Sequence, residues 1–347
     1  MNILLLSPLP PPSGGIATWT EKYCRYCKAN HISVDLVNIA IIGNRKGAIG
    51  NRRNLFDEVK RTFFIYRDLE RKIKHRNYDI AHLNTSCGEF GIYRDLLLAR
   101  EIKKCNIPLI LEAHCNLDTA LRKKHVTKWF KKLTKLSDRV LVLNNRSLRT
   151  AKEYCSEKVQ CVPNFIDDEY TIGHRDIAQE LGTIVYTGHV QEDKGCYDIL
   201  EVAKREQYIQ FYLIGAVNDQ FKNYSIPSNV HLVGEVKMDE VEKYLKKADL
   251  YIFLSHSEGF SMSLLEAMAL GLPVIATDVG ANEDMVADQG GRIISVGDID
   301  AAIQAVEDMR DYKSRSEASA WNIRKVRSHY TISTVIPQLI NLYNEAK

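Results

Sequence analysis

The stretch from Ser257 to Thr277 constrains this chain more than any other segment does. It follows an apolar run at 250–254 that predicts a buried strand, and a loop of small residues leads from there into a helix that we expect to begin near Ser263. Gly271 and Pro273 then predict that this helix ends and that a new strand follows. Strand, loop, helix and strand in such close succession are typical of a parallel α/β layer.

Two carboxylates lie eight residues apart in this stretch, Glu258 in the loop and Glu266 in the first turn of the predicted helix. A helix start carries unpaired backbone N–H groups and the positive end of the helix dipole. A diphosphate that carries two sugars would suit it, with the carboxylates accepting hydrogen bonds from sugar hydroxyls. The alternative is a capping box, in which Glu266 turns back to a helix capped by Ser263 and Glu258 is a solvated loop acid. On this stretch alone both interpretations stay open.

The length of 347 residues predicts two domains, and the 45% apolar and 26% charged fractions are those of a soluble globular protein. No segment approaches the length of a membrane-spanning helix, and residues 1–12 contain an apolar run too short for a signal peptide. We therefore expect a cytoplasmic protein whose eight scattered cysteines are reduced thiols. Their spacing does not favour a zinc site.

Charge is distributed unevenly along the chain, although the net charge is only +3. Residues 1–165 contain 30 Lys and Arg against 15 Asp and Glu, which gives +15, and the remaining residues contain 17 against 29, which gives −12. A basic half joined to an acidic half suggests that the first half faces something anionic.

Strand-like runs alternate with helical segments in both halves, which predicts a parallel sheet with helices on both faces in each. The first-half runs lie at 2–7, 33–38, 79–83, 108–113 and 139–143. The second-half runs lie at 183–187, 210–214, 230–233, 249–254, 274–277 and 292–295. Proline and polar residues at 161–167 predict a linker between the halves.

Three loop segments are candidates for holding an anion or a sugar. Gly14-Gly15 precedes a helix, where it either lets an anion approach the backbone or forms a plain tight turn. His114 follows the carboxyl end of a strand, where doubly wound sheets bind ligands, or is simply a hydrogen-bonded loop histidine. Lys194 precedes another helix, where it either meets a phosphate or lies on a surface turn.

Two helices of the basic half combine an apolar stripe with many positive charges. The stripe of the first helix comprises Leu55, Val59, Phe63, Tyr66, Leu69 and Ile73, and its basic residues are Lys60, Arg61, Arg67, Arg71, Lys72 and Lys74. The second helix, at 122–136, carries seven basic residues. These helices either lie against anionic lipid headgroups or cover a sheet with solvated outer faces, and both interpretations stay open.

The loop from Gly188 to Gly195 and the paired carboxylates with their continuation A-M-A-L-G-L-P-V-I-A-T resemble a known family. They are similar to the retaining, nucleotide-sugar-dependent glycosyltransferases of family 4 (group 1), which have the GT-B fold. The resemblance covers nearly the whole chain and implies two Rossmann-like, doubly wound parallel-sheet domains that face a cleft. The acceptor-binding domain would comprise residues 1–165 with about 325–347, and the donor-binding domain residues 166–324.

The resemblance also implies a role for each candidate side chain. Glu266 would bind the ribose hydroxyls of the donor, Glu258 the hydroxyls of the transferred hexose, and Lys194 the diphosphate. His114 would contact the donor sugar near the reacting carbon, so that the catalytic set is His114, Lys194 and Glu258. The implied donor-binding set is Gly14, Gly15, Gly188, His189, Lys194, Glu258, Gly259, Phe260, Ser261, Met262, Ser263, Leu264 and Glu266.

The chain departs from the family pattern at two positions. His189 stands where an arginine is usual, and a histidine is only partly charged near neutral pH. Ser261 stands where glycine is common, which narrows the expected hexose pocket.

The function that the resemblance implies is transfer of a hexose, with retention, from a UDP- or GDP-linked donor in surface polysaccharide assembly. The expected acceptor is a glycan, lipid-diphosphate-linked at the inner face of a membrane that the basic half contacts, and neither cofactor nor metal is expected. An epimerase or hydrolase acting on nucleotide sugars and an inactive nucleotide-sugar-binding homologue stay as alternatives. A nucleic-acid binder is disfavoured, because the basic helices lack interleaved stacking aromatics.

Overall fold

The structure is a computed structural model that describes residues 1–11, 14–40, 55–287 and 289–346. The chain divides into two compact units, Met1–Phe165 with Ile332–Lys347, and Ile166–Thr331. The sequence places the return of the chain to the first unit at about residue 325. In the structure helix α12, Tyr312–His329, lies in the second unit, and helix α13, Ile332–Ala346, lies in the first.

The first unit contains a six-stranded sheet in the order β2-β1-β3-β4-β5-β6. All neighbouring strands pair in parallel, as the alternation of strands and helices predicts. The strands are β1 Asn2–Ser7, β2 Ser33–Asn38, β3 Ile80–Thr85, β4 Leu109–Ala113, β5 Arg139–Val142 and β6 Val159–Cys161. The short β6 is missing from the sequence prediction because two of its three residues are exposed and it carries no apolar run.

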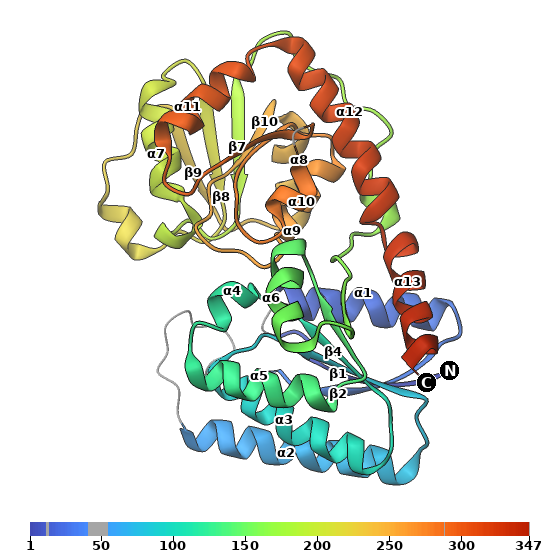
Figure 1. Cartoon of the computed structure of the whole chain (residues 1–347). Helices are drawn as coiled ribbons and strands as arrows, with labels where there is room; N and C mark the ends of the chain where they lie inside the picture. The colour runs from blue at the N-terminus through green and yellow to red at the C-terminus, as the bar shows by residue number, and fades with distance from the viewer. Residues whose placement is uncertain (12–13, 41–54, 288, 347) are drawn as a thin grey trace. The chain divides into compact units, whose positions relative to one another are not determined.

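Alternate residues of a strand point to opposite faces of a sheet, and this alternation divides the core of the first unit in two. Ile3 and Leu5 of β1 lie in the cluster formed with α1, Gly15–Ala29, and α13. Leu4 and Leu6 lie in the cluster on the opposite face. The helices of that face, drawn in Figure 1, are α2 Leu55–His75, α3 Glu89–Lys104, α5 Lys124–Leu136 and α6 Asn145–Cys155, with the short α4 Leu117–Ala120.

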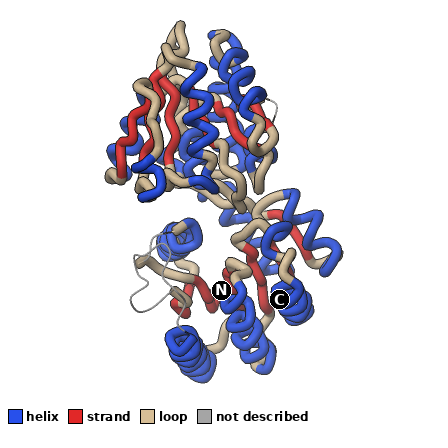
Figure 2. Tube along the Cα trace, turned by 90° about the vertical axis from the view of Figure 1, so that its left-hand side faces the viewer, coloured by secondary structure: helices blue, strands red, loops and turns tan. Residues whose placement is uncertain are grey.

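The second unit has its own six-stranded parallel sheet, in the order β12-β11-β10-β7-β8-β9. Its strands are β7 Thr183–Thr187, β8 Gln210–Ile214, β9 Val230–Gly234, β10 Leu250–Phe253, β11 Val274–Thr277 and β12 Gly291–Ile294. Besides α12, its helices are α7 Cys196–Arg205, α8 Met238–Lys247, α9 Met262–Ala269, α10 Asn282–Val286 and α11 Ile299–Asp308. Three short 3-10 turns are η1 Asp168–Tyr170, η2 Glu192–Lys194 and η3 Asp219–Asn223. Figure 2 shows the strands as red segments among the blue helices.

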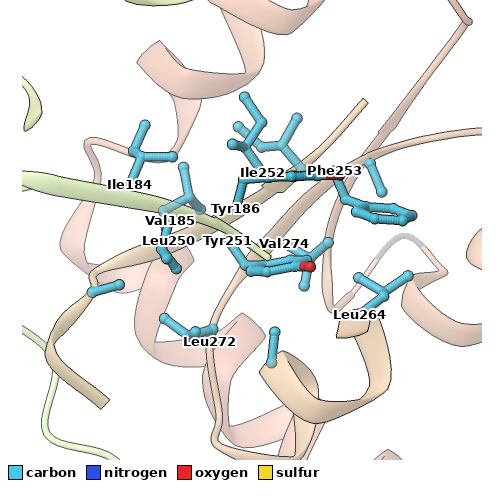
Figure 3. Packing of buried hydrophobic residues seen from close by; sticks show 14 of the residues in the cluster. Ile184, Val185, Tyr186, Leu250, Tyr251, Ile252, Phe253, Leu264, Leu272 and Val274 are labelled. Atoms are coloured by element: carbon cyan, nitrogen blue, oxygen red, sulfur yellow. The ribbon is translucent and has the colours of Figure 1, made fainter. Parts of the chain in front are cut away.

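The core of the second unit is centred on β7, β10 and β11 (Figure 3). The ring of Phe253 stacks against Tyr186 and Tyr251, with centroid distances of 6.1 Å in both pairs. The Tyr251 hydroxyl, buried in this core, pairs with the Thr187 hydroxyl at 3.1 Å. Leu264 of α9 packs in the same cluster, so the start of α9 is anchored to the sheet.

In each sheet the strand order reverses at one point, between β1 and β3 in the first unit and between β7 and β10 in the second. Ligands of doubly wound sheets bind outside the carboxyl ends of the strands at such a switch point. Both units are therefore Rossmann-like and doubly wound, which confirms the fold class that the sequence predicts. Within the described ranges, no helix is both long and apolar enough to cross a membrane.

Candidate functional site

The loops after β7 and β10 bring Lys194 and Glu258 together at the switch point of the second sheet. Lys194 ends the turn η2, and Glu258 lies in the loop before α9. Lys194 Nζ is 2.7 Å from Glu258 Oε1, and 24% and 14% of the two side chains are exposed. The Ser255 hydroxyl donates to the same Glu258 oxygen at 2.9 Å. The ion pair is thus oriented by the protein and still reachable from solvent.

Glycine permits close contact at both loops. Gly195 has φ +67°, and a Cβ at this position would lie 1.8 Å from the Leu254 carbonyl oxygen just after β10. A Cβ at Gly280, which has φ +56°, would lie 2.3 Å from the Glu258 carbonyl oxygen. A side chain at either position would displace the backbone beside Lys194 or Glu258.

Helix α9 starts one residue earlier than the sequence predicts. Its N-cap is Ser261, whose hydroxyl accepts a hydrogen bond from the Leu264 amide at 3.2 Å. Ser263 is therefore already a helical residue, and Glu266 lies in the second turn rather than the first. The capping box of Ser263 and Glu266 is wrong, because the position three residues after the true cap is Leu264.

The same cap narrows the set of backbone donors at the start of α9. The Leu264 amide donates to the Ser261 hydroxyl, and the Leu265 amide donates to the Ser261 carbonyl at 3.2 Å. The Leu264 and Leu265 amides are thus engaged within the helix itself, so the diphosphate contact expected at this helix start is restricted to the amides of residues 260–263. Ser261 is only 4% exposed, so the serine that replaces the usual glycine serves as a helix cap.

Glu266 is half-buried on α9 and acts electrostatically on a nearby phenol. Burial raises the pKa of the Tyr170 hydroxyl far above its ordinary value, and the negative charge of Glu266 adds to the rise. Its neighbour on the helix, Ser263, hydrogen-bonds the buried Tyr251. Glu266, the predicted ribose-binding carboxylate, thus lies near the hydroxyls of Tyr170 and Tyr251. The sequence spacing does not predict this proximity.

Gly188 and His189 follow β7 and are both exposed. Gly188 has φ +144°, and a Cβ at Gly215 would lie 2.0 Å from its carbonyl oxygen. The His189 carbonyl accepts a hydrogen bond from the Tyr186 hydroxyl at 2.8 Å. The backbone of this loop is therefore held on two sides, while His189 itself is exposed to solvent.

In the first unit, Gly14-Gly15 forms an open helix start. Gly14 is the N-cap of α1 and makes no side-chain cap hydrogen bond. Both glycines are exposed, and an added Cβ at either one would meet nothing within 4 Å. This geometry allows an anion to reach the first amides of α1. A plain turn would look the same, so the predicted donor contact stays a prediction.

His114 follows β4, as the sequence indicates, but its ring is packed inside the unit. Only 2% of the side chain is exposed, and its Nε2 is 3.4 Å from Glu112 Oε1. The other Glu112 oxygen is 2.9 Å from His82 Nε2. Trp19 packs edge-on against both imidazoles, with centroid distances of 5.5 Å. A contact between the His114 ring and a donor sugar stays a prediction.

Glu112 is a fully buried carboxylate that the sequence interpretation missed. Burial raises its pKa, but the charges and hydrogen bonds of His114 and His82 outweigh burial and lower the pKa to about 2. His82 also hydrogen-bonds the Tyr343 hydroxyl, so helix α13 joins the network. The available signal was an acidic residue inside the otherwise apolar strand 109–113. Ser255 was missed because it carries no charge.

The groups that could face an anionic ligand are the Lys194 ammonium and the starts of α1 and α9. In the parts of the chain that the structure describes, no group of three or more His, Cys, Asp or Glu residues could hold a metal ion.

Two family models match the chain, one for each unit. The model described as "Glycosyl transferases group 1" matches residues 172–325, and the model described as "Glycosyltransferase Family 4" matches residues 13–170. The two matches together extend over most of the chain.

Among curated relatives, the 2-deoxystreptamine N-acetyl-D-glucosaminyltransferase of Niallia circulans is 25% identical over 305 residues, which are 78% of this chain and 77% of the relative. The UDP-Gal:alpha-D-GlcNAc-diphosphoundecaprenol alpha-1,3-galactosyltransferase of Escherichia coli is 24% identical over 84% of this chain and 80% of its own length.

Solved structures share the fold at low identity. A sucrose-phosphate synthase of Thermosynechococcus elongatus superimposes with a TM-score of 0.82 at 16% identity, over 99% of this chain and 98% of that chain. HepE of Anabaena, solved with UDP-glucose, superimposes with a TM-score of 0.71 at 14% identity, over 99% of this chain and 100% of that one.

Proposed function

The chain belongs to the group 1 glycosyltransferases with the GT-B fold, and from that premise we propose that it transfers a hexose, with retention, from a nucleotide-diphosphate sugar to a glycan. Two further relatives are named as enzymes of capsular polysaccharide biosynthesis and of lipopolysaccharide core biosynthesis. A donor of this class fits the name of the Escherichia coli relative and the UDP-glucose in the HepE structure.

The observation that carries this proposal is the contact between Lys194 and Glu258 at the switch point of the second sheet. The two charged atoms are 2.7 Å apart and partly exposed, beside the start of α9. In a nucleotide sugar the hexose is bonded directly to the diphosphate. Binding groups for a phosphate and for a hexose hydroxyl must therefore be neighbours, as this lysine and this carboxylate are.

The proposed reaction breaks the bond between the anomeric carbon and the diphosphate oxygen, which keeps the electron pair. The acceptor hydroxyl bonds the same carbon from the same face, and its proton passes to the departing phosphate. Negative charge grows on the diphosphate, so Lys194 and the α9 amides stabilise the transition state more than the ground state. We propose that this lysine, rather than a metal ion, neutralises the leaving group.

The proposed acceptor is a glycan linked to a lipid diphosphate at the cytoplasmic face of a membrane. The excess of 15 positive charges in residues 1–165 favours an anionic partner for the first unit. The name of the Escherichia coli relative includes such an acceptor.

The test has two stages. A thermal-shift screen of nucleoside diphosphates and then of nucleotide sugars identifies the donor, since a ligand that binds only the folded state raises the melting temperature. Proton NMR of that donor, incubated with and without lipid-diphosphate-linked glycans, then follows the sugar. We expect a new α-glycosidic signal from an α-linked donor only when the acceptor is present.

The same spectra discriminate the alternative enzymes. An epimerised sugar or free hexose that accumulates equally without acceptor would replace the proposal with an epimerase or a hydrolase. Donor binding without any turnover would indicate an inactive nucleotide-sugar-binding homologue.

A further inference from the structure

Helix α2 exposes large apolar side chains, three of them aromatic, that a helix covering a sheet normally buries. Phe56, Val59, Phe63 and Phe64 are 73%, 64%, 55% and 55% exposed. Leu69, by contrast, is fully buried in the core beneath the helix. The predicted single apolar stripe is therefore wrong for Val59 and Phe63, which point outward, and the side chain of Leu55 lies outside the described part.

Basic side chains share this outward side of α2. At 3.6 residues per turn, positions 56, 60, 63, 67 and 74 lie on one side of the helix. We call the following exposed residues the outer face of α2: Phe56, Val59, Lys60, Phe63, Phe64, Arg67, Arg71 and Lys74. Its first half is largely aromatic and its second half largely basic, and the half-buried Glu70 lies on the same side of the helix.

The charges of the outer face remain available to a partner. The Arg67 guanidinium lies 5.8 Å from the ring centre of Phe63, so charge and ring form one surface. Arg71 pairs with Asp68 at 2.8 Å, but 70% of its side chain is exposed. Two of the helix's other basic residues are not outward, because Arg61 bonds the Ile39 carbonyl and Lys72 pairs with Asp68.

Helix α5 has five Lys residues and no acidic residue, whereas α2 has six Lys and Arg residues and four acidic ones, and the two helices also differ in their apolar residues. Val126, Phe130 and Leu133 are 1%, 0% and 0% exposed, and they pack against the sheet. Trp129 packs edge-on against Tyr93 and is covered by the Lys132 ammonium at 4.9 Å. Helix α5 therefore has the solvated outer face of an ordinary covering helix, and exposed aromatic rings rather than a larger positive charge distinguish α2 from it.

We propose that the outer face of α2 docks on an anionic lipid surface. Phe56, Phe63 and Phe64 enter the boundary between headgroups and acyl chains, while Lys60 and the later basic residues bind headgroup phosphates. Aromatic rings combined with Lys and Arg on one helix face favour this location, because each group finds its preferred environment at the interface.

A second copy of this chain is the main competing occupant of the outer face. In a two-fold contact the same patch would meet itself, and Lys60, Arg67 and Lys74 would face like charges. Anionic phosphates instead complement those charges. The lipid surface is therefore the favoured partner, and it would bring the enzyme to the lipid-linked acceptor under the proposed function.

The experiment uses the full chain and flotation with phosphatidylcholine vesicles that contain or lack phosphatidylglycerol. We expect binding to the anionic vesicles only. The variant Phe56→Ser/Phe63→Ser/Phe64→Ser should lose about tenfold or more of that binding while its melting temperature stays unchanged, since the rings are exposed. Lys60→Glu/Arg67→Glu should weaken low-salt binding by about fivefold or more per position.

The matched control lies on α5. Lys124→Glu/Lys128→Glu makes the same change in net charge at exposed positions, and we expect binding within about twofold of the unchanged chain. A Phe63→Trp variant adds a direct readout, because lipids with brominated acyl chains should quench an inserted indole.

Three outcomes would overturn the proposal: no affinity for anionic vesicles, equal losses from the α2 and α5 charge reversals, or self-association that disappears in the triple Phe variant. The last outcome would assign the outer face to a second copy. Transfer to a water-soluble acceptor, measured on every variant, should stay unchanged. Vesicle binding without any transfer would contradict the proposed function while leaving this inference standing.

Discussion

The carboxyl edges of the two sheets hold their charged groups in different ways. In the second unit, Lys194 and Glu258 lie in loops, and 24% and 14% of their side chains are exposed. In the first unit, Glu112 lies within strand β4 and is fully buried between His82 and His114. One edge has a charge pair that solvent reaches, and the other has a charge network enclosed by the core.

This difference indicates different uses of charge. A partly exposed ion pair is worth little by itself, so a ligand can replace one partner at small cost. A buried carboxylate that loses its partners is strongly destabilising, so its arrangement is kept. We infer that the second edge exchanges partners with a ligand, whereas the first maintains one arrangement around His114.

The largest expected effect is on Glu266 of the second edge. Glu266→Ala should reduce transfer by about 10³-fold or more with little change in melting temperature, because under the proposed function this carboxylate accepts hydrogen bonds from the ribose hydroxyls of the donor. Ser261→Ala is the matched control on the same helix, and loss of this cap should cost about 1 kcal/mol of unfolding free energy. Donor affinity and chemical denaturation are measured on both variants. A Glu266→Ala variant that loses unfolding free energy but keeps its donor affinity would indicate a capping role for Glu266 instead.

Lys194→Ala should come next, with transfer reduced by about 10²- to 10³-fold because the growing charge on the diphosphate loses its counterion. Lys243→Ala, at an exposed lysine of α8, should leave kcat unchanged. Steady-state kinetics with the identified donor measure both. A normal kcat of the Lys194→Ala enzyme would contradict the inference that the carboxyl edge of the second sheet exchanges its ion-pair partners with a ligand.

Glu112→Gln tests the first edge through stability. The pKa of about 2 lies below the ordinary 4.5, so the carboxylate stabilises the fold above about pH 4.5, and this contribution is lost as the pH falls through 2. The variant should lose about 3 kcal/mol of unfolding free energy at pH 7. Between pH 4.5 and 2 its unfolding free energy should fall less steeply than that of the unchanged chain. Urea denaturation across this range measures it. Glu21→Gln, at an exposed glutamate of α1, should change neither value.

Glycine substitutions contrast the two edges directly. Gly195→Ala should cost about 2 kcal/mol or more and reduce transfer, since the new Cβ would meet the Leu254 carbonyl and the backbone has φ +67°. Gly15→Ala should leave stability within about 0.5 kcal/mol, because its Cβ would enter open space. Thermal melting measures both. A stable Gly195→Ala protein would show that the lysine turn is not held by this contact.

The smallest effect is expected at His189. His189→Arg should raise kcat/KM by about threefold, because an exposed arginine carries a full charge at neutral pH. An activity loss would show that the histidine is required as such.

Much of the fold was predictable, because strand and helix periods are local properties of the chain. Runs such as 33–38 and 183–187 match their strands, and parallel pairing follows from the alternation. The candidate residues Lys194 and Glu258 were identified from motifs 64 residues apart, and only the structure brings them to 2.7 Å. The start of α9 was misplaced because Ser261 and Ser263 are both good caps, and packing of Leu264 selects between them.

The sequence by itself determined two parallel α/β units, the asymmetry of charge and the paired carboxylates, since composition and spacing carry this information. Only the tertiary structure decided the buried triad of His82, Glu112 and His114, and the outward turn of Phe63 on α2. The physical reason is that pattern identifies an apolar or charged residue, whereas burial depends on which neighbouring element covers it.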